Sequence, residues 1–244
     1  MGTLRAVWRL AKVLAVTLFR ICRLFAVASV KGWSPGLMAR HAREWAHALV
    51  KTLNIDITCQ GRFPDRGVLM VSNHRSYLDI VVILSHFESA FLAKKELRSW
   101  PVFGYAAHLG NTVFVDRENR ESRKASRQAL LERLDQGISV VIFPEGTTHG
   151  GPGLLPFKKG IFHMVAEQEI PVVPVGVFYE DRSAAWIGDD FFVPHFLRIF
   201  SNPGLAADLT IGPVIQNLSG EALEQACHQF IQNSLAAKEG PVPN

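Results

Sequence analysis

A histidine and an aspartate lie five residues apart, directly after a short apolar run. The run is Val68–Val71, and His74 and Asp79 follow it. A buried strand of this length ends in a loop, so both side chains can be delivered to one place. There a histidine can take or give a proton near neutral pH. A loop histidine that caps a neighbouring element is the more frequent reason for this spacing, so the decision rests on other segments.

Three later segments combine an apolar run with polar residues at its end. GNTVFVDR at 110–117 is a strand pattern that ends in Asp-Arg, and FPEGTT at 143–148 is stopped by proline and followed by Glu145 and Gly146. IPVVPVG at 170–176 is the third. Ligands in open α/β sheets bind at the carboxyl ends of strands. The convergence of four such segments therefore indicates one site at the edge of a sheet.

The elements that would position these residues alternate between strand and helix patterns. This alternation predicts an α/β layered fold with a mostly buried central sheet flanked by helices. We expect a helix hairpin at 1–54 and the main domain at 55–244, divided where the sequence pattern changes. A tight polar insert is expected at 186–195. Strands are expected at 55–61, 68–72, 90–93, 113–116, 139–143, 172–178 and 208–211, and helices at 78–86, 100–109, 122–136, 159–169 and 219–237.

The first thirty residues predict a helix that lies on a membrane. Their uncharged runs, 13–19 and 24–30, are shorter than the roughly 18 to 20 residues that a spanning helix needs. Gly32 ends this helix, and Ser34-Pro35 begins a second one that runs to about Leu53. Packing of the two helices on the protein's own core is the alternative. The basic residues of the first helix fall in one sector, which is typical of an interfacial helix; they are Arg5, Arg9, Lys12, Arg20 and Arg23.

The composition limits the partners. The chain has 244 residues, 48% of them hydrophobic, and a formal net charge of +4. Anionic partners such as a membrane surface or a phosphorylated substrate are expected, whereas nucleic acid is not, because the basic residues form no arm. The three cysteines form no paired motif, which fits a reducing compartment, and no metal-binding constellation is present. We therefore expect a peripheral or monotopic protein on the cytoplasmic face of a membrane.

With the four segments in this order, the chain resembles the glycerolipid acyltransferase family, which includes 1-acylglycerol-3-phosphate acyltransferases. NHRSYLD, GNTVFVDR, FPEGTTHG and IPVVPV correspond to its four blocks, and the resemblance covers roughly residues 60–215. It implies transfer of a fatty acyl group from acyl-CoA or acyl carrier protein to a lipid hydroxyl, with membrane lipids around the site and no cofactor. It also implies an interfacial helix pair at the N-terminus.

The resemblance assigns roles to individual residues. His74 would be the general base that deprotonates the acceptor hydroxyl, and Asp79 would fix its tautomer. Arg117 would hold the acceptor's phosphate through a bidentate guanidinium. Its alternative is a salt bridge to a neighbouring carboxylate. The remaining acceptor-site residues implied by the third block are Glu145, Gly146, Thr147, Thr148 and Lys158.

One position departs from the family pattern. The third block usually continues FPEGTR, whereas this chain has Thr148 at the place of the arginine. The positive charge must then come from Arg117, Lys158 or Lys159, or the acceptor is not a simple glycerol phosphate. We expect conversion of lysophosphatidic acid to phosphatidic acid. The alternatives are acylation of another lysolipid such as lyso-ornithine lipid, and a non-catalytic membrane lipid-binding protein.

Overall fold

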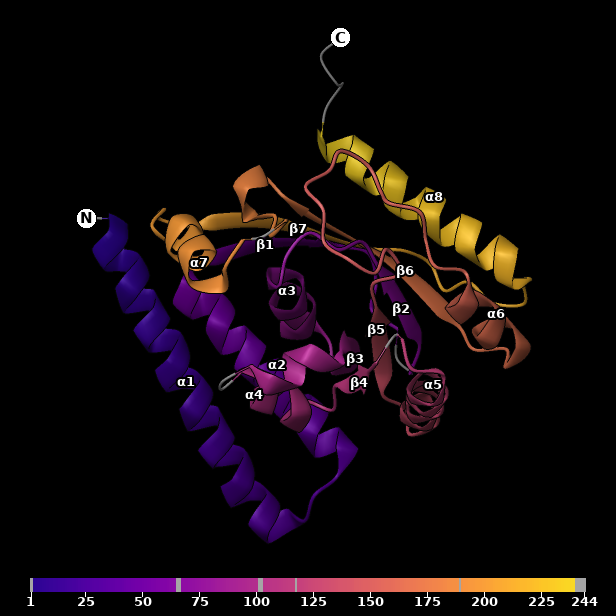
Figure 1. Cartoon of the computed structure of the whole chain (residues 1–244), viewed down its shortest axis with the longest axis horizontal. Helices are drawn as coiled ribbons and strands as arrows, with labels where there is room; N and C mark the ends of the chain where they lie inside the picture. Colours follow the sequence, from indigo (N-terminus) through magenta and orange to yellow (C-terminus); the bar gives the residue numbers. More distant parts are fainter. Residues whose placement is uncertain (1, 65–66, 101–102, 117, 189, 240–244) are drawn as a thin grey trace.

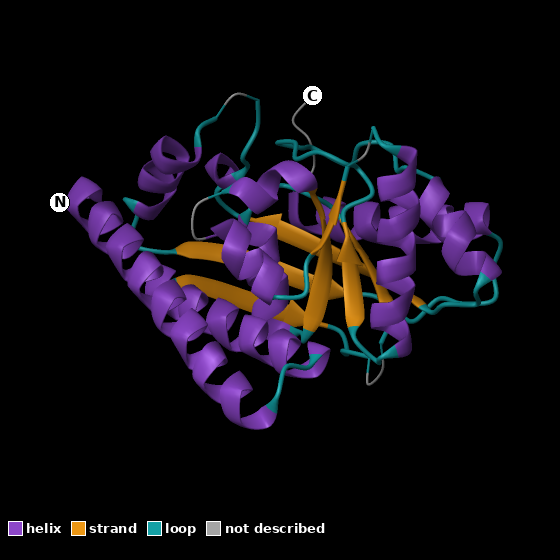
Figure 2. Ribbon diagram, turned by 60° about the horizontal axis from the view of Figure 1, so that its bottom comes forward, coloured by secondary structure: helices purple, strands orange, loops and turns teal. Residues whose placement is uncertain are grey.

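A computed structural model describes residues 2–64, 67–100, 103–116, 118–188 and 190–239. Its centre is a mixed seven-stranded sheet in the order β1-β7-β6-β2-β5-β3-β4, with helices on both faces (Figures 1 and 2). The predicted α/β fold with a flanked central sheet is confirmed. The strands are β1 (Ile55–Gln60), β2 (Leu69–Ser72), β3 (Ser89–Lys94), β4 (Val113–Val115), β5 (Ser139–Ile142), β6 (Val172–Tyr179) and β7 (Leu205–Ile211).

The central strands share one direction. β2 pairs in parallel with both β5 and β6, and β3 pairs in parallel with β5 and β4. β7 runs antiparallel to β6, and β1 lies parallel to β7 at the edge of the sheet. The carboxyl ends of β2, β4, β5 and β6 therefore meet at one edge, where the four sequence segments were expected to converge.

Alternating side chains of β2 divide the core into two layers. Met70 belongs to the layer under α1 (Gly2–Lys31), α2 (Pro35–Leu53), α3 (Leu78–His86) and α7 (Phe192–Phe200). Leu69 and Val71 belong to the layer under α5 (Arg120–Asp135), α6 (Gly160–Glu167) and α8 (Gly220–Glu239). Because β2 is buried on both faces, it reads as a continuous apolar run. A short α4 (Phe103–Leu109) and two 3₁₀ turns, η1 (Lys95–Ser99) and η2 (Arg182–Ala184), complete the described elements.

The N-terminal hairpin begins and ends as expected. Gly32 has a φ of 79°, which favours glycine and ends α1. The Ser34 hydroxyl accepts a hydrogen bond of 3.2 Å from the Leu37 amide and caps α2, whose first residue is Pro35. Leu49 of α2 is buried in the same core layer as the sheet, so the hairpin packs on the protein itself. The division of the chain at residue 54 stays a prediction.

The basic stripe of α1 does not form an outward surface, and this part of the sequence interpretation is wrong. Arg9 is 8% exposed and donates to the carbonyls of Phe200, Asn202 and Pro203 at 3.1, 2.6 and 2.6 Å, just beyond the end of α7. A cation is favourable there because the carbonyl end of a helix is partially negative. Arg5 donates to the Ser201 carbonyl at 3.0 Å.

The other end of the stripe is also paired within the protein. Arg20 and Arg23 both reach Glu44 of α2 at 2.7 Å. Helical periodicity gave the correct sector for these residues, but it could not say which sector faces the protein. Lys12 and Arg23 remain exposed, and Lys12 lies over the ring of Trp8.

The outward surface of α1 is instead apolar. Within the described residues, α1 is the one helix that is long and apolar enough to cross a membrane, judged by length and composition. This helix suggests that the protein associates with a membrane through apolar side chains rather than through charged ones. The exposed apolar residues of the hairpin are Leu4, Val7, Trp8, Leu18, Phe19, Phe25, Val30 and Trp33.

The region after β6 contains a helix that the sequence interpretation missed. α7 occupies the second half of the expected polar insert, and its Phe196, Ile199 and Phe200 are buried. Pro194 was taken as part of a tight loop, but it lies in the first turn of α7, where the missing N–H costs nothing. The buried positions repeat at helical spacing, and this was the available signal.

Candidate active site

His74 and Asp79 lie at the carboxyl end of β2 and form a direct hydrogen bond. The His74 Nδ1 and Asp79 Oδ2 atoms are 2.7 Å apart. The same oxygen accepts hydrogen bonds from the backbone amides of Arg75 and Ser76 at 2.7 and 2.9 Å. Because this carboxylate only accepts, Nδ1 carries the proton, and Nε2 is left as the basic nitrogen.

Asp79 is held without access to water. It is 0% exposed, lies in the first turn of α3, and its Oδ1 accepts from the Tyr179 hydroxyl at 2.8 Å. Burial and the Asp79 charge hold the pKa of Tyr179 well above its usual value, so the hydroxyl stays protonated and donates. The start of a helix also favours a negative charge. Four hydrogen bonds thus fix this carboxylate and its orientation toward His74.

The imidazole of His74 is fixed on its other sides as well. Its ring stacks on Phe143 at the end of β5, with ring centroids 3.9 Å apart and planes 10° apart. The loop before it is tied to β6, because Asn73 exchanges two hydrogen bonds of 2.8 Å with the backbone of Val177. The side chain of His74 keeps 20% exposure. The ring can therefore meet a substrate while its direction is set by the protein.

Glu145 lies behind His74 rather than beside it. Its Oε1 accepts from the His74 backbone amide at 2.8 Å, and its Oε2 accepts from the Leu155 amide at 2.9 Å. The side chain is 0% exposed and also contacts His149, with 2.6 Å between Oε2 and Nε2. Burial raises the pKa of Glu145, while the two amides and Arg75 oppose this rise. Glu145 therefore ties the His74 loop to the segment 149–155.

His149 and Arg75 complete this buried polar cluster. Burial and the nearby Arg75 lower the pKa of His149 to about 4, so near pH 7 a neutral imidazole meets the Glu145 carboxylate. The Gly151 amide donates to His149 Nδ1 at 3.1 Å, which agrees with a proton on Nε2. Arg75 is 6% exposed, touches the His149 ring, and donates to the Gly153 carbonyl at 2.5 Å. Burial lowers the pKa of Arg75.

The other predicted acceptor-site residues differ in position. Gly146 is buried and has a φ of 79°, a conformation that requires glycine. Thr147 and Lys158 are exposed. The Thr148 hydroxyl donates to the Trp186 carbonyl at 2.5 Å. Arg117 lies outside the described residues, so its expected role stays a prediction.

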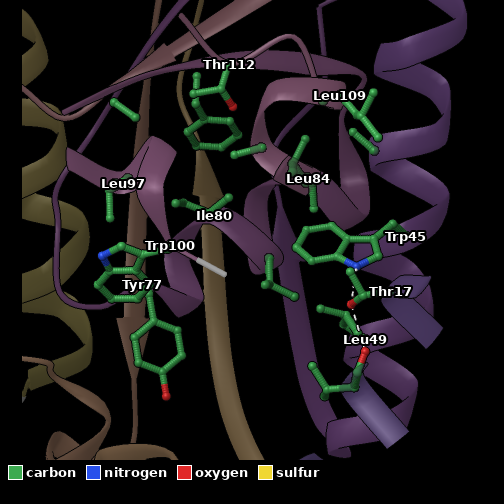
Figure 3. A pocket seen from close by; sticks show the side chains of 18 of the residues that line it. Thr17, Trp45, Leu49, Tyr77, Ile80, Leu84, Leu97, Trp100, Leu109 and Thr112 are labelled. Carbon is green, nitrogen blue, oxygen red and sulfur yellow. Dashed lines mark hydrogen bonds between the residues drawn. The ribbon is translucent and has the colours of Figure 1, made fainter. Parts of the chain in front are cut away.

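An apolar cavity of about 220 Å³ opens beside His74. It lies between the sheet and helices α1 to α4, and its lining is almost entirely apolar. Figure 3 shows Tyr77 and Trp100 on one side of the pocket and Trp45 and Leu49 on the opposite side, with Ile80 and Leu84 between them. α2 alone lines the cavity from residue 41 to residue 53, about 18 Å at 1.5 Å per residue. This length and polarity fit an extended hydrocarbon chain.

Two polar side chains of this wall, Trp45 and Thr17, satisfy each other, whereas the buried Nε2 of His41 has no hydrogen-bond partner among the described residues. Trp45 Nε1 donates to Thr17 Oγ1 at 3.0 Å, and Thr17 donates to the Val13 carbonyl at 2.7 Å. Within the described part of the chain no group of three or more histidine, cysteine, aspartate or glutamate side chains gathers as a metal site. The cavity therefore presents a mostly apolar surface to a ligand, with His74 in its lining.

Comparisons with known proteins agree with this geometry. The model of a family described as "Acyltransferase" matches residues 54–178, about half of the chain. This chain belongs to the acyltransferase family. The lyso-ornithine lipid O-acyltransferase of Brucella abortus is 30% identical over 98% of each chain. The 1-acyl-sn-glycerol-3-phosphate acyltransferase of Neisseria meningitidis is 32% identical over 67% of this chain and 68% of its own length.

A solved structure shares the fold of this acyltransferase. It is the 1-acyl-sn-glycerophosphate (LPA) acyltransferase from Thermotoga maritima, with a TM-score of 0.71, 20% identity, and coverage of 97% of this chain and 100% of the other. At this identity the likeness concerns the fold alone. The predicted enzyme class, a lysolipid O-acyltransferase of lipid metabolism with an acyl donor and a lysolipid acceptor, is confirmed.

Several functional residues of the acyltransferase were not found from the sequence. Tyr179 is the last residue of β6 and lies one residue beyond the expected strand, and Phe143 directly follows β5; neither was assigned a role. Arg75 lies inside the motif NHRSYLD, but only His74 and Asp79 of this motif were assigned catalytic roles. Trp186 was noted without a role. For Tyr179 the signal was a polar hydroxyl at the end of an apolar strand, because a buried hydroxyl needs a partner.

Proposed function

We propose that this acyltransferase transfers a fatty acyl group from a thioester to the free hydroxyl of lyso-ornithine lipid. The observation that carries the reaction is the His74–Asp79 pair at the mouth of an apolar cavity. His74 Nε2 takes the proton of the acceptor hydroxyl as its oxygen attacks the thioester carbonyl. When the carbon–sulfur bond breaks, the thiolate leaves and takes this proton from the imidazolium.

Asp79 supports this step electrostatically. Its charge is buried and fixed, so it stabilises the imidazolium that forms during the transfer without moving. The donor's acyl chain lies in the cavity, and its carbonyl carbon lies at the mouth, near His74. The donor is the thioester of CoA or of acyl carrier protein, since both present the same reactive group.

The acceptor is proposed from two observations. Relatives named as lyso-ornithine lipid O-acyltransferases match this chain over most of its length, as the Brucella abortus protein does. In addition, Thr148 stands where a phosphate-binding arginine is usual in the resembling family. Ornithine brings a carboxylate and an ammonium group instead of a phosphate, so it needs less positive charge. Lysophosphatidic acid remains the second candidate, supported by the relative from Neisseria meningitidis.

Membrane attachment is part of the proposal. The exposed apolar side chains of α1 would enter the lipid layer, and α1 and α2 also line the cavity. The acyl chain can then remain in apolar surroundings on its way to the site. We place the protein on the cytoplasmic face of a membrane, where acyl-CoA and acyl carrier protein are available.

A competition assay tests this function. The purified enzyme in lipid vesicles receives oleoyl-CoA and equal amounts of lyso-ornithine lipid and lysophosphatidic acid, and mass spectrometry measures both diacyl products. We expect ornithine lipid to dominate, and we expect His74→Ala to lose about 10²- to 10⁴-fold in rate. His163→Ala, an exposed histidine on α6, is the matched control.

The outcomes separate the possible errors. Phosphatidic acid as the main product would replace the proposed acceptor by the second candidate. Equal rates for His74→Ala and the wild-type enzyme, with both folded, would remove the proposed base. No diacyl product with either acceptor would contradict the function as stated.

A further inference from the structure

We propose that Thr148 is a positioning residue, and that the side chain it positions, Trp186, forms the wall of the cavity mouth against the first carbons of the donor's acyl chain. The inference rests on the proposed function in one respect, the placement of the acyl chain in the cavity. It assigns to Thr148 a role that differs from contact with the acceptor.

The backbone around Trp186 is held from two catalytic loops. Thr148, in the loop after β5, donates its hydroxyl to the Trp186 carbonyl at 2.5 Å. The Trp186 amide donates to the carbonyl of Arg75, in the loop after β2, at 2.9 Å. The backbone carbonyl and the backbone amide of Trp186 are therefore both bonded to the loops that carry His74 and Glu145. A segment that follows β6 is in this way fixed to the reaction centre.

The side chain of Trp186 is fixed as well. Its Nε1 donates to the Asp190 carbonyl at 2.7 Å, which closes the turn that contains it. Its ring meets Tyr77 and Trp100 edge to face, with centroid distances of 5.6 and 5.7 Å. Such pairs contribute about 0.5–1.5 kcal/mol beyond their buried area. The three rings and His74 all line the same cavity.

The chemistry of this wall identifies what it touches. Rings of tryptophan and tyrosine give a rigid apolar surface, and the indole N–H of Trp186 is already bonded within the protein. On Trp186 this surface offers no free indole N–H to the carboxylate of a head group, whereas methylene groups next to a thioester carbonyl would bury their apolar surface on it. Figure 3 shows Tyr77 and Trp100 together at one end of the cavity. We therefore assign this end to the carbonyl end of the acyl chain.

The hydroxyl of Thr148 is used within the protein, at the position where the resembling family usually has an arginine. A threonine donor reaches the Trp186 carbonyl from the loop itself, and its hydrogen is used there. Valine has the shape of threonine without the hydroxyl, and serine keeps the hydroxyl without the methyl group. These two substitutions separate the hydrogen bond from the packing.

The experiment compares Thr148→Val, Thr148→Ser, Trp186→Ala and the double variant Thr148→Val/Trp186→Ala, with oleoyl-CoA and hexanoyl-CoA as donors. We expect Thr148→Val to lower kcat/KM for oleoyl-CoA about five- to tenfold, as the loss of one hydrogen bond predicts, and Thr148→Ser to restore it. Hexanoyl-CoA, which gains less from the cavity, should lose less. In the double variant the two losses should not multiply, because both act through the same wall. Thr58→Val, an exposed threonine on β1, is the control.

Two results would overturn the inference. If Thr148→Val raises the KM of the lysolipid equally with both donors and its effect multiplies with that of Trp186→Ala, Thr148 binds the acceptor. Hydrogen exchange gives a readout that needs no activity: the Trp186 amide should lose protection in Thr148→Val and keep it in Thr148→Ser. Unchanged protection in the valine variant would contradict the positioning role, even if the wild-type enzyme acylates neither lysolipid and the proposed function fails separately.

Discussion

Replacing Asp79 by asparagine tests the proposed base most directly. The amide keeps the shape of the carboxylate, and its oxygen can still accept from the Arg75 and Ser76 amides. The negative charge is lost, however. At a charge separation of about 4 Å and an effective dielectric constant of about 20, the attraction to the imidazolium of His74 is about 4 kcal/mol. This corresponds to a rate loss of roughly 10³-fold if the imidazolium is fully formed in the transition state.

Two controls make this prediction interpretable. Tyr179→Phe removes one of the four hydrogen bonds to Asp79 but keeps the charge, so kcat should fall less than about tenfold. Thermal unfolding followed by circular dichroism shows whether each variant is folded. The assay measures thiol release from oleoyl-CoA with the lysolipid in excess, so that kcat is obtained. A folded Asp79→Asn enzyme with kcat within threefold of wild type would refute the claim that Asp79 supports His74 as the base.

Three further predictions follow from other parts of the structure. Glu145→Gln should lower kcat about ten- to a hundredfold with little change in the KM of the lysolipid, because the carboxylate holds the catalytic loop; a change in KM alone would assign it to the acceptor. The pKa of His149 is 6.5 in the unfolded chain and about 4 in the folded protein. Between pH 6.5 and pH 4, His149 is therefore protonated in the unfolded chain but neutral in the folded protein. Stability should therefore fall from pH 6.5 to pH 4, by at most about 3 kcal/mol from this group, and denaturant unfolding of His149→Gln should show a flatter profile. Leu18→Asp/Phe19→Asp should weaken sedimentation with vesicles of neutral lipid, whereas Arg23→Gln should not; the reverse result would restore the basic stripe as the membrane contact.

Short-range signals explain why much of the fold could be predicted. α3 was expected at the bounds that it has, 78–86, because its apolar residues follow directly on the Asp79 turn. α2 was predicted well because Ser34, Pro35 and Gly32 are local signals that need no knowledge of the rest of the chain. The order of the four segments indicated one edge of the sheet, because parallel strands deliver their ends together. These inferences depend on spacing alone.

What could not be predicted depends on partners distant in the sequence. Arg9 and the α7 end that it contacts are about 190 residues apart, so no local pattern could show that this arginine is buried. The hydrogen bond from Tyr179 to Asp79 could not be predicted for the same reason, since the two residues are 100 positions apart. The hydrogen bond from the Thr148 hydroxyl to the Trp186 carbonyl likewise became visible only in the tertiary structure. The motifs identified His74 and Asp79, but not the residues that hold this pair in place, such as Tyr179 and Phe143.

The arrangement separates the reaction from the recognition of the lipid. His74 and Asp79 lie on the ends of rigid, fully buried elements, so their mutual geometry depends little on which lipid enters. Much of the cavity wall instead comes from α1, α2 and the segment around Trp186, although the first two motif blocks also contribute Tyr77 and Thr112. A change of acceptor or acyl chain can therefore arise there without disturbing the base. Thr148 is the point where the two parts meet, because one hydroxyl in a catalytic motif fixes a residue of the lipid-binding wall.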